Sequence, residues 1–274
     1  MNVCICNYTG DMSVTSSGSM PVLYLSHGAP PLLDDSRWID ELQKWRNRLP
    51  TPESILVISA HWESNPISVS SSGSVPLVYD FWGFEERFYQ LKYPAPGSAS
   101  LGASLDRLLA QAHQPVDHDE PRGLDHGAWV PLMVMFPEAT IPVMQLSLPT
   151  LEPAQLLALG RTLAPLRDEG VLIVGSGFFT HNLRQLRWDA GPDADPPSWS
   201  REFDEWGANA LAAGEVGQLL DFAHAAPAAA IAHPRTEHFA PLFVTLGAGG
   251  DDPIVNEVEG FWFGMAKRSI SMGA

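Results

Sequence analysis

Short apolar runs alternate along the chain with longer segments in which apolar residues recur every three or four positions. The apolar runs are almost continuous, as is typical of strands buried on both faces of a parallel or mixed sheet. They lie at residues 21–26, 54–60, 141–148 and 170–177. The amphipathic segments predict helices over residues 34–49, 98–112, 153–170 and 199–214. This alternation predicts an α/β fold with a central, mostly parallel or mixed sheet and helices on both of its faces.

The domain organisation is simple, because no internal repeat or low-complexity linker divides the chain. The Pro- and Asp-rich stretch at 188–199 is expected to be a surface loop. Residues 1–19 have many Ser, Gly and Asn and little periodicity, which predicts a disordered N-terminal tail ahead of a single domain over residues 20–274. Met20 directly precedes the first strand-like run, so translation could start at Met1 or at Met20.

Composition narrows the function classes. With 274 residues and 45% apolar content the chain can bury a large core. A formal charge of −16 argues against nucleic acid and favours a small-molecule partner. No apolar run reaches the ~20 residues of a membrane span, and the first residues lack a signal-peptide pattern, so we expect a cytoplasmic protein without a membrane partner. The only cysteines, Cys4 and Cys6, cannot form a disulfide framework or a thiolate cluster.

Five of the nine histidines lie where a predicted strand ends or a predicted helix begins. They are His27, His61, His126, His181 and His238. In an open α/β sheet, ligands bind in the crevice beyond the carboxyl ends of the strands. We therefore expect these five imidazoles to converge there.

A lone histidine is more often structural, and His113, His118 and His224 are expected at the surface, with His233 undecided. Five histidines at element ends, most beside Gly or Ser, instead favour a mononuclear metal site. The sequence has no G-x-S-x-G, H-E-x-x-H, P-loop or G-x-G-x-x-G, which weakens the nucleophile-elbow hydrolase, kinase and dehydrogenase interpretations. A zinc-dependent hydrolase and a binding module without a redox metal remain as alternatives.

Several motifs, in the same order, resemble the class III extradiol ring-cleavage dioxygenases, most closely the branch typified by 4,5-DOPA extradiol dioxygenase. The motifs are "LSHGAPP", "SAHWES", "YDFWGFEERFYQLKYPAPGS", "GLDHGAWVPL", "IPVMQLSL", "SGFFTHNLR" and "HPRTEHFAPLFVTLGA". The resemblance runs from about Pro21 to the C-terminus. It implies that residues 20–274 form a catalytic domain whose non-haem Fe(II), with Zn(II) as the alternative, binds a catechol and O₂ and opens the ring beside the diol.

The resemblance also implies roles for the histidines. His27 and His61 match two metal ligands. His238 matches a further ligand, but the wider class often uses a glutamate in this region and Glu237 is adjacent, so the third ligand stays open. His181 matches a histidine that is either the catalytic base or a fourth ligand. His126 matches a second active-site histidine, which would hydrogen-bond the substrate or dioxygen.

Seven aromatic residues lie within residues 79–93. They predict either a packed loop over the sheet or an aromatic wall for a flat phenolic ring. The sequence does not indicate which catechol is bound, although Arg184, Arg235 and Lys92 lie in or near the motifs and could meet a carboxylate. It also leaves the oligomeric state open.

Overall fold

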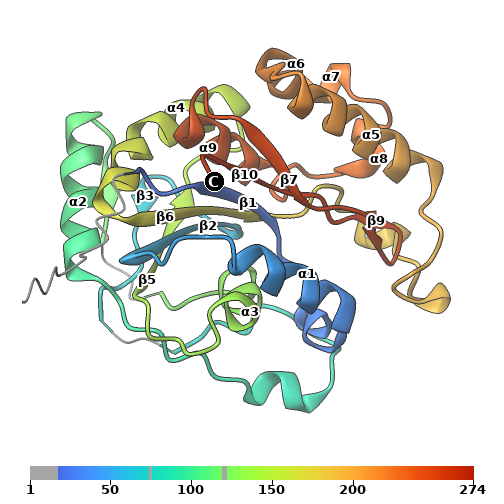
Figure 1. Ribbon diagram of the computed structural model, residues 1–274, viewed down its shortest axis with the longest axis horizontal. Helices are drawn as coiled ribbons and strands as arrows, with labels where there is room; N and C mark the ends of the chain where they lie inside the picture. The colour runs from blue at the N-terminus through green and yellow to red at the C-terminus, as the bar shows by residue number, and fades with distance from the viewer. Residues whose placement is uncertain (1–17, 74–75, 119–121) are drawn as a thin grey trace, which may run out of the picture.

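The four predicted strands are neighbours in a six-stranded sheet of the computed structural model, which describes residues 18–73, 76–118 and 122–274. Along the sheet the order is β5-β2-β6-β1-β10-β7 (Figure 1). The four parallel strands are β1 (Val22–Ser26), β2 (Ser54–Glu63), β5 (Val143–Leu148) and β6 (Val171–Gly177). Their carboxyl ends therefore meet at one edge of the sheet.

Two C-terminal strands extend the sheet in the antiparallel direction. β10 (Ser269–Met272) pairs with β1, and β7 (Ile254–Val258) pairs with β10. The sequence analysis did not predict either strand, because both are short and contain as many polar as apolar positions or nearly so. They make the sheet mixed, which the prediction had allowed, and the α/β fold class is confirmed.

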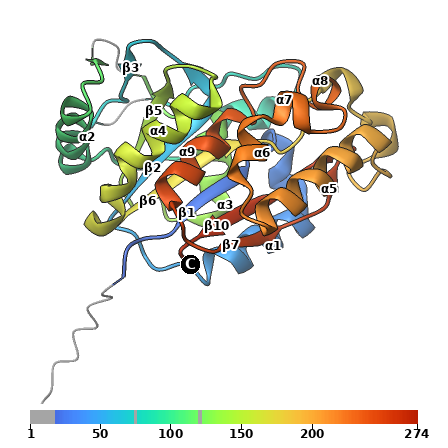
Figure 2. The ribbon, with the colours of Figure 1, turned by 90° about the horizontal axis from the view of Figure 1, so that it is seen from above.

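Helices cover both faces of the sheet, as predicted. One face carries α1 (Ser36–Arg46) and α3 (His126–Met135), and the other carries α4 (Pro153–Leu163) and α9 (Ala240–Gly249). Figure 2 shows α4 and α9 in front of the sheet with α1 and α3 behind it. α2 (Ala99–Gln111) lies beside α4.

The four predicted helices agree with α1, α2, α4 and α5 (Ser198–Ala212) in position. Their ends have local causes: the side chain of Asp35 caps α1, that of Ser98 caps α2, and the left-handed Gly170 follows the 3₁₀ turn that extends α4. The stretch at 188–199 is indeed a loop with one short turn, and α5 starts within its last residues.

The helix that follows His238, α9, is buried on all sides, since every one of its residues is buried. Two glycines allow α4 and α9 to lie this close. A Cβ on Gly160 would lie 2.1 Å from the carbonyl oxygen of Val244, and one on Gly247 would lie 2.1 Å from that of Leu157. α9 is therefore held deep between α4 and the sheet.

The remaining elements are short. The strands among them are β3 (Ile67–Ser68), β4 (Val116–Asp117), β8 (Phe261–Trp262) and β9 (Met265–Ala266). The short helices and 3₁₀ turns are α6 (Val216–Leu220), α7 (Phe222–Ala225), α8 (Ala229–Ala232), η1 (Pro30–Asp34), η2 (Glu86–Gln90), η3 (Ala164–Glu169), η4 (Leu183–Gln185) and η5 (Trp188–Ala190). All these elements surround one hydrophobic core.

Two sequence predictions cannot be followed in the structure. Cys4, Cys6 and nearly all of the expected N-terminal tail at 1–19, with the question of the translation start, lie outside the described residues. Among the described residues, no helix combines the length and the apolar character needed to cross a membrane.

Candidate active site

The five histidines line one cavity of about 580 Å³ at the carboxyl edge of the sheet. His27 directly follows β1, and His181 lies four residues beyond β6. His126 is the first residue of α3, as predicted, whereas His238 comes two residues before α9. His61 was expected after the end of a strand but lies inside β2, which continues to Glu63 through an irregularity in its pairing with β5.

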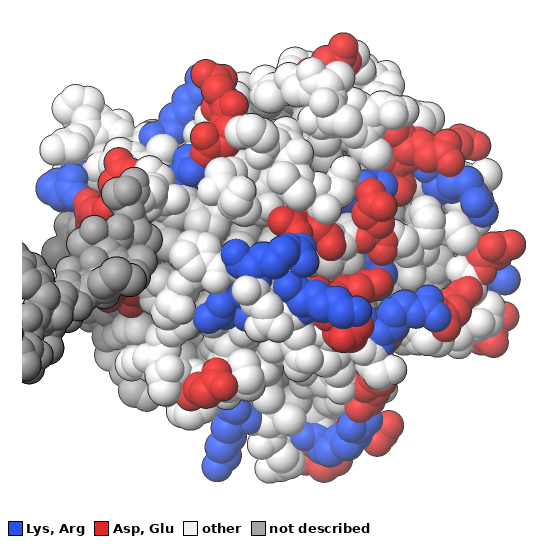
Figure 3. Space-filling model, viewed as in Figure 1, with Lys and Arg blue, Asp and Glu red and all other residues white. Residues whose placement is uncertain are grey.

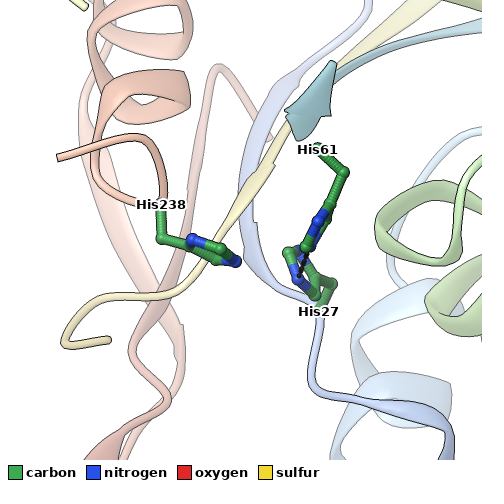
Figure 4. A group of neighbouring side chains, drawn as sticks. All are labelled: His27, His61 and His238. Carbon is green, nitrogen blue, oxygen red and sulfur yellow. Dashed lines mark hydrogen bonds between the residues drawn. The ribbon is translucent and has the colours of Figure 1, made fainter. Parts of the chain in front are cut away.

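Three of these imidazoles bring their ring nitrogens close enough together to hold one metal ion. One ring nitrogen from each of His27, His61 and His238 lies within 4.8 Å of the other two. The Nε2 atoms of His27 and His61 are 3.1 Å apart. Figure 4 shows His238 reaching from the side of α9 toward His27 and His61, which project from the strands.

Burial keeps this group neutral. Loss of hydration is the largest cause that lowers the pKa of His27 and His238 well below the usual value, and the neighbouring histidines lower it further. Burial is also the main cause that lowers the pKa of His61 to about 3, and the charge of His126 is the second cause. Neutral imidazoles are the form that binds metal ions.

Hydrogen bonds on the outer ring nitrogens define which nitrogen carries the proton. The hydroxyl of Ser176 donates to the carbonyl of Gly127 at 2.5 Å, so toward Nδ1 of His27, at 3.0 Å, it can only accept. Nδ1 of His238 donates to Oε1 of Glu237 at 2.9 Å. His27 and His238 therefore present unprotonated Nε2 atoms.

Such contacts on the outer nitrogen are typical of metal-binding histidines. For His61 the corresponding neighbour is Asp80, whose Oδ2 lies 3.5 Å from Nδ1. The group of His27, His61 and His238 thus has the donor type, the protonation state and the spacing that suit one divalent metal ion.

Two further groups of three donors overlap with this one. Glu237 belongs with His181 and His238, and its Oε1 already accepts from His238. The group that contains both His27 and His61 includes His238 and not Glu237. Of the two residues left open by the sequence, His238 is therefore the better placed third donor.

His181 stacks on His238, with ring centroids 3.4 Å apart and an interplanar angle of 15°. Its Nδ1 is 3.9 Å from Oε1 of Glu237. Burial, followed by the charges of His233 and His126, lowers its pKa to about 3. His181 thus lines the cavity as a neutral imidazole beside His238.

His126 is held by a carboxylate that the sequence analysis did not single out. Oδ1 of Asp80 accepts from Nδ1 of His126 at 2.7 Å and from its backbone N–H at 3.1 Å. Burial opposes ionisation of Asp80, but the hydrogen bonds and charge of His126, helped by His61, outweigh it and lower its pKa to about 2. Asp80 is the only acid among the aromatic residues of "YDFWGF", a signal that points to the segment but not to its partner.

The aromatic segment at 79–93 is divided between the cavity and the core. Phe81, Trp82 and Phe84 line the cavity, whereas Phe88 and Tyr93 are buried in the core. The sequence analysis missed the rest of the apolar lining, which comes from distant segments. These residues are Phe178, Leu183, Leu186, Trp188, Trp262 and Met265.

The charged lining includes one of the three cationic residues considered from the sequence. Arg235 lies at the cavity and donates to both oxygens of Glu63, at 2.6 and 2.7 Å, with Glu237 3.4 Å away. Arg184 and Lys92 are not among the described residues that line it.

The other histidines behave mostly as ordinary residues. His113, His118 and His224 are exposed, as expected. His233, which the sequence left undecided, is buried behind the site against Phe203 and Phe239.

Known proteins that are similar to this chain include extradiol dioxygenases. Residues 19–265 match the family described as the catalytic LigB subunit of aromatic ring-opening dioxygenase. A 4,5-DOPA dioxygenase extradiol from Beta vulgaris is 43% identical over 88% of this chain and 91% of its own length. One of the same name from Escherichia coli (strain K12) is 39% identical over 95% of this chain and 97% of its own length.

A solved structure is also similar. The crystal structure of an uncharacterized protein from Escherichia coli K12 has a TM-score of 0.77 and 36% identity to this chain, covering 93% of this chain and 100% of its own. With its histidine-lined cavity and a family match over most of its length, the chain belongs to the LigB family of aromatic ring-opening dioxygenases, the class III extradiol ring-cleavage enzymes.

Proposed function

We propose that this protein is an Fe(II)-dependent extradiol dioxygenase that uses O₂ to open the ring of a catechol-type substrate. The observation that carries the proposal is the group of three neutral imidazoles, with His27 and His238 buried and His61 partly buried, in a cavity with an aromatic wall. Membership of the ring-opening dioxygenase family supports the reaction class.

In this proposal His27, His61 and His238 hold the metal ion. Three nitrogen donors and no thiolate suit Fe(II), and they suit Zn(II) as well. When bound, Fe(II) would supply a Lewis acid that lowers the pKa of the catechol hydroxyls and a redox centre for O₂. A set of three protein donors, unlike a closed set of four, leaves room for further ligands.

Two histidines are proposed to handle protons. His181 is proposed as the base for a catechol hydroxyl, because it lines the cavity as a neutral imidazole and is not needed in the group of three. His126 is proposed to hydrogen-bond the substrate or dioxygen. Since its Nδ1 donates to Asp80, its Nε2 is the nitrogen left free for that contact.

The aromatic wall is proposed to bind the flat ring and to exclude water. Phe81, Phe84 and Trp82 offer ring faces and edges on the side of His126, and the ring of Phe81 meets that of His126 edge-on. Water excluded in this way leaves the protons of the hydroxyl groups to the histidines.

The proposed substrate is DOPA or another substituted catechol. Two relatives that share about two fifths of their residues with this chain carry the name 4,5-DOPA dioxygenase extradiol. The cavity of about 580 Å³ has room for a ring with a side chain, and its Arg235, Glu63 and Glu237 could meet charged substituents.

We also propose that the protein acts in the cytoplasm on small molecules, and not on nucleic acid or membranes. This rests on the charge of −16 and on the absence of a basic stripe in the sequence. On the face drawn in Figure 3, basic side chains mostly lie beside acidic ones. Pairs such as Lys44 with Asp40 and Arg48 with Glu257 are of this kind.

The experiment that tests the proposal is anaerobic reconstitution of the metal-free protein with Fe(II) or with Zn(II). DOPA, protocatechuate, gallate and unsubstituted catechol are then added, followed by air. We expect O₂ uptake and a yellow ring-opened product with the iron form only. Turnover by the zinc form alone would instead support a zinc-dependent hydrolase. An iron form that takes up no O₂ with any of the catechols would support a binding module.

A further inference from the structure

We infer that Asp80 is a positioning residue of the active site. Its carboxylate fixes the orientation of the His126 ring and supports the outer nitrogen of His61. This inference rests on the proposed function, because it assigns His126 to the substrate side and His61 to the metal. The carboxylate of Asp80 lies at the cavity with 22% of its side chain exposed. It comes from the aromatic segment, 46 residues before His126 in the chain.

One oxygen of Asp80 fixes both the backbone and the ring of His126. Oδ1 accepts from the backbone N–H at 3.1 Å and from Nδ1 at 2.7 Å. The residue that precedes α3, Asp125, makes no side-chain cap, so Asp80 takes this role from outside the helix. The start of the helix and the direction of the ring are thus set by the same carboxylate.

The bond also decides which nitrogen of His126 is protonated. A carboxylate oxygen only accepts, so Nδ1 carries the proton and Nε2 is left with its lone pair. The second oxygen, Oδ2, lies 3.5 Å from Nδ1 of His61. The ring centroids of His61 and His126 are 4.0 Å apart, and Asp80 faces the outer nitrogen of both.

The segment that carries Asp80 is itself fixed against α3. The backbone N–H of Val78 donates to the carbonyl of Leu124 at 2.8 Å, and Nε1 of Trp129 donates to the carbonyl of Val78 at 3.2 Å. Phe81 is buried and lies edge-on to His126 at 5.8 Å. Asp80 is therefore held between two anchored residues, as a positioning group needs to be.

The first test measures the tautomer of His126 in the metal-free protein by long-range ¹H–¹⁵N NMR, with the signal assigned by loss in His126→Gln. We expect the proton on Nδ1 in the wild type and a mixture of the two tautomers in Asp80→Ala. Asp80→Asn should keep the proton on Nδ1. The backbone N–H of His126 needs an acceptor at Oδ1, so the amide oxygen and not the amide NH₂ will take that position.

The second test measures kcat and KM per bound iron. Loss of an outer contact of this kind typically costs about 10–100-fold, so we expect kcat of Asp80→Ala to fall by that factor, with KM for the catechol little changed. Asp80→Asn should recover most of the loss. Asp34→Asn is the matched control, since it breaks an ion pair with Arg87 near the same segment but contacts no histidine, and its kcat should equal that of the wild type.

The inference is overturned if His126 of the wild type carries its proton on Nε2, or if Asp80→Ala leaves both the tautomer and kcat unchanged. Should Asp80→Ala fail to fold, the wild-type spectrum and Asp80→Asn still decide. A wild-type protein that opens no catechol would refute the proposed function, whereas the tautomer in the metal-free protein would still be read independently.

Discussion

At the scale of single residues, burial and the partner of the outer ring nitrogen determine the protonation state of each histidine in the cavity. His27 faces the hydroxyl of Ser176 and His238 faces the carboxylate of Glu237, so each turns an unprotonated nitrogen toward the cavity. Among the described residues His181 has no such close partner, and Oε1 of Glu237 lies 3.9 Å from its Nδ1. A histidine that holds a metal and one that only moves a proton should therefore differ when each is removed.

We expect His61→Ala to lose iron and activity together, because removing one of three donors removes a bond and the geometry at once. His181→Ala should keep its iron and still bind catechol, while its turnover falls by about 10²–10⁴-fold, the usual contribution of a general acid or base. Metal analysis and kcat of the purified variants check both expectations.

The exposed His113 provides the control, since His113→Ala should retain full iron and turnover. Iron lost from His181→Ala would make His181 a fourth ligand. Near-full iron in His61→Ala would remove His61 from the ligand set.

Among the elements, the crossing of α4 with α9 decides how deeply His238 is placed. His238 stands two residues before α9, and α9 is buried on every side. Backbone meets backbone at the crossing, since a Cβ on Gly160 would lie 2.1 Å from the carbonyl oxygen of Val244. Neither group can rotate away.

Gly160→Ala should therefore lower the free energy of unfolding by about 1–3 kcal/mol, as overpacking does, although alanine is the better helix former. Gly217→Ala in α6 is the matched control, because nothing lies within 4 Å of its Cβ position. That change should be neutral or stabilising by up to about 1 kcal/mol. Urea unfolding of both variants provides the comparison, and equal stabilities would contradict the close packing.

For the molecule as a whole, buried neutral histidines make stability depend on pH. His233 donates from Nε2 to the carbonyl of Phe179 at 3.0 Å, and its Nδ1 is buried without a hydrogen-bond partner. Burial outweighs this hydrogen bond and lowers the pKa of His233 from 6.5 to about 4. The folded chain thus binds this proton less strongly than the unfolded chain does.

The free energy of unfolding of the metal-free protein should consequently fall as the pH drops from 6.5 toward 4, by about 3 kcal/mol from His233 alone. His233→Gln keeps a donor for Phe179 and does not titrate, so it should lose less stability over this range. Urea unfolding at several pH values measures the difference, in which the other titrating groups cancel. Equal losses in the two proteins would rule out this role for His233.

Much of the framework could be inferred from the order of the amino acids. Periodicity located the four parallel strands and four of the helices, and the start of a further helix was expected near His126, where α3 begins. These features depend on local hydrogen bonds and on which side chains can face a core, both of which a short window of sequence records. The short β7 and β10 were missed because their stability comes from pairing with distant strands.

In the site, the difference between what the sequence indicates and what the fold decides is larger. The sequence singled out all five histidines of the cavity, because glycines, serines and element ends surround them. It did not indicate that His238 rather than Glu237 joins His27 and His61, that His181 stacks on His238, or that Asp80 meets His126. Such contacts join residues up to 211 positions apart, and only the path of the chain through the folded core brings them together and determines which nitrogen keeps its proton.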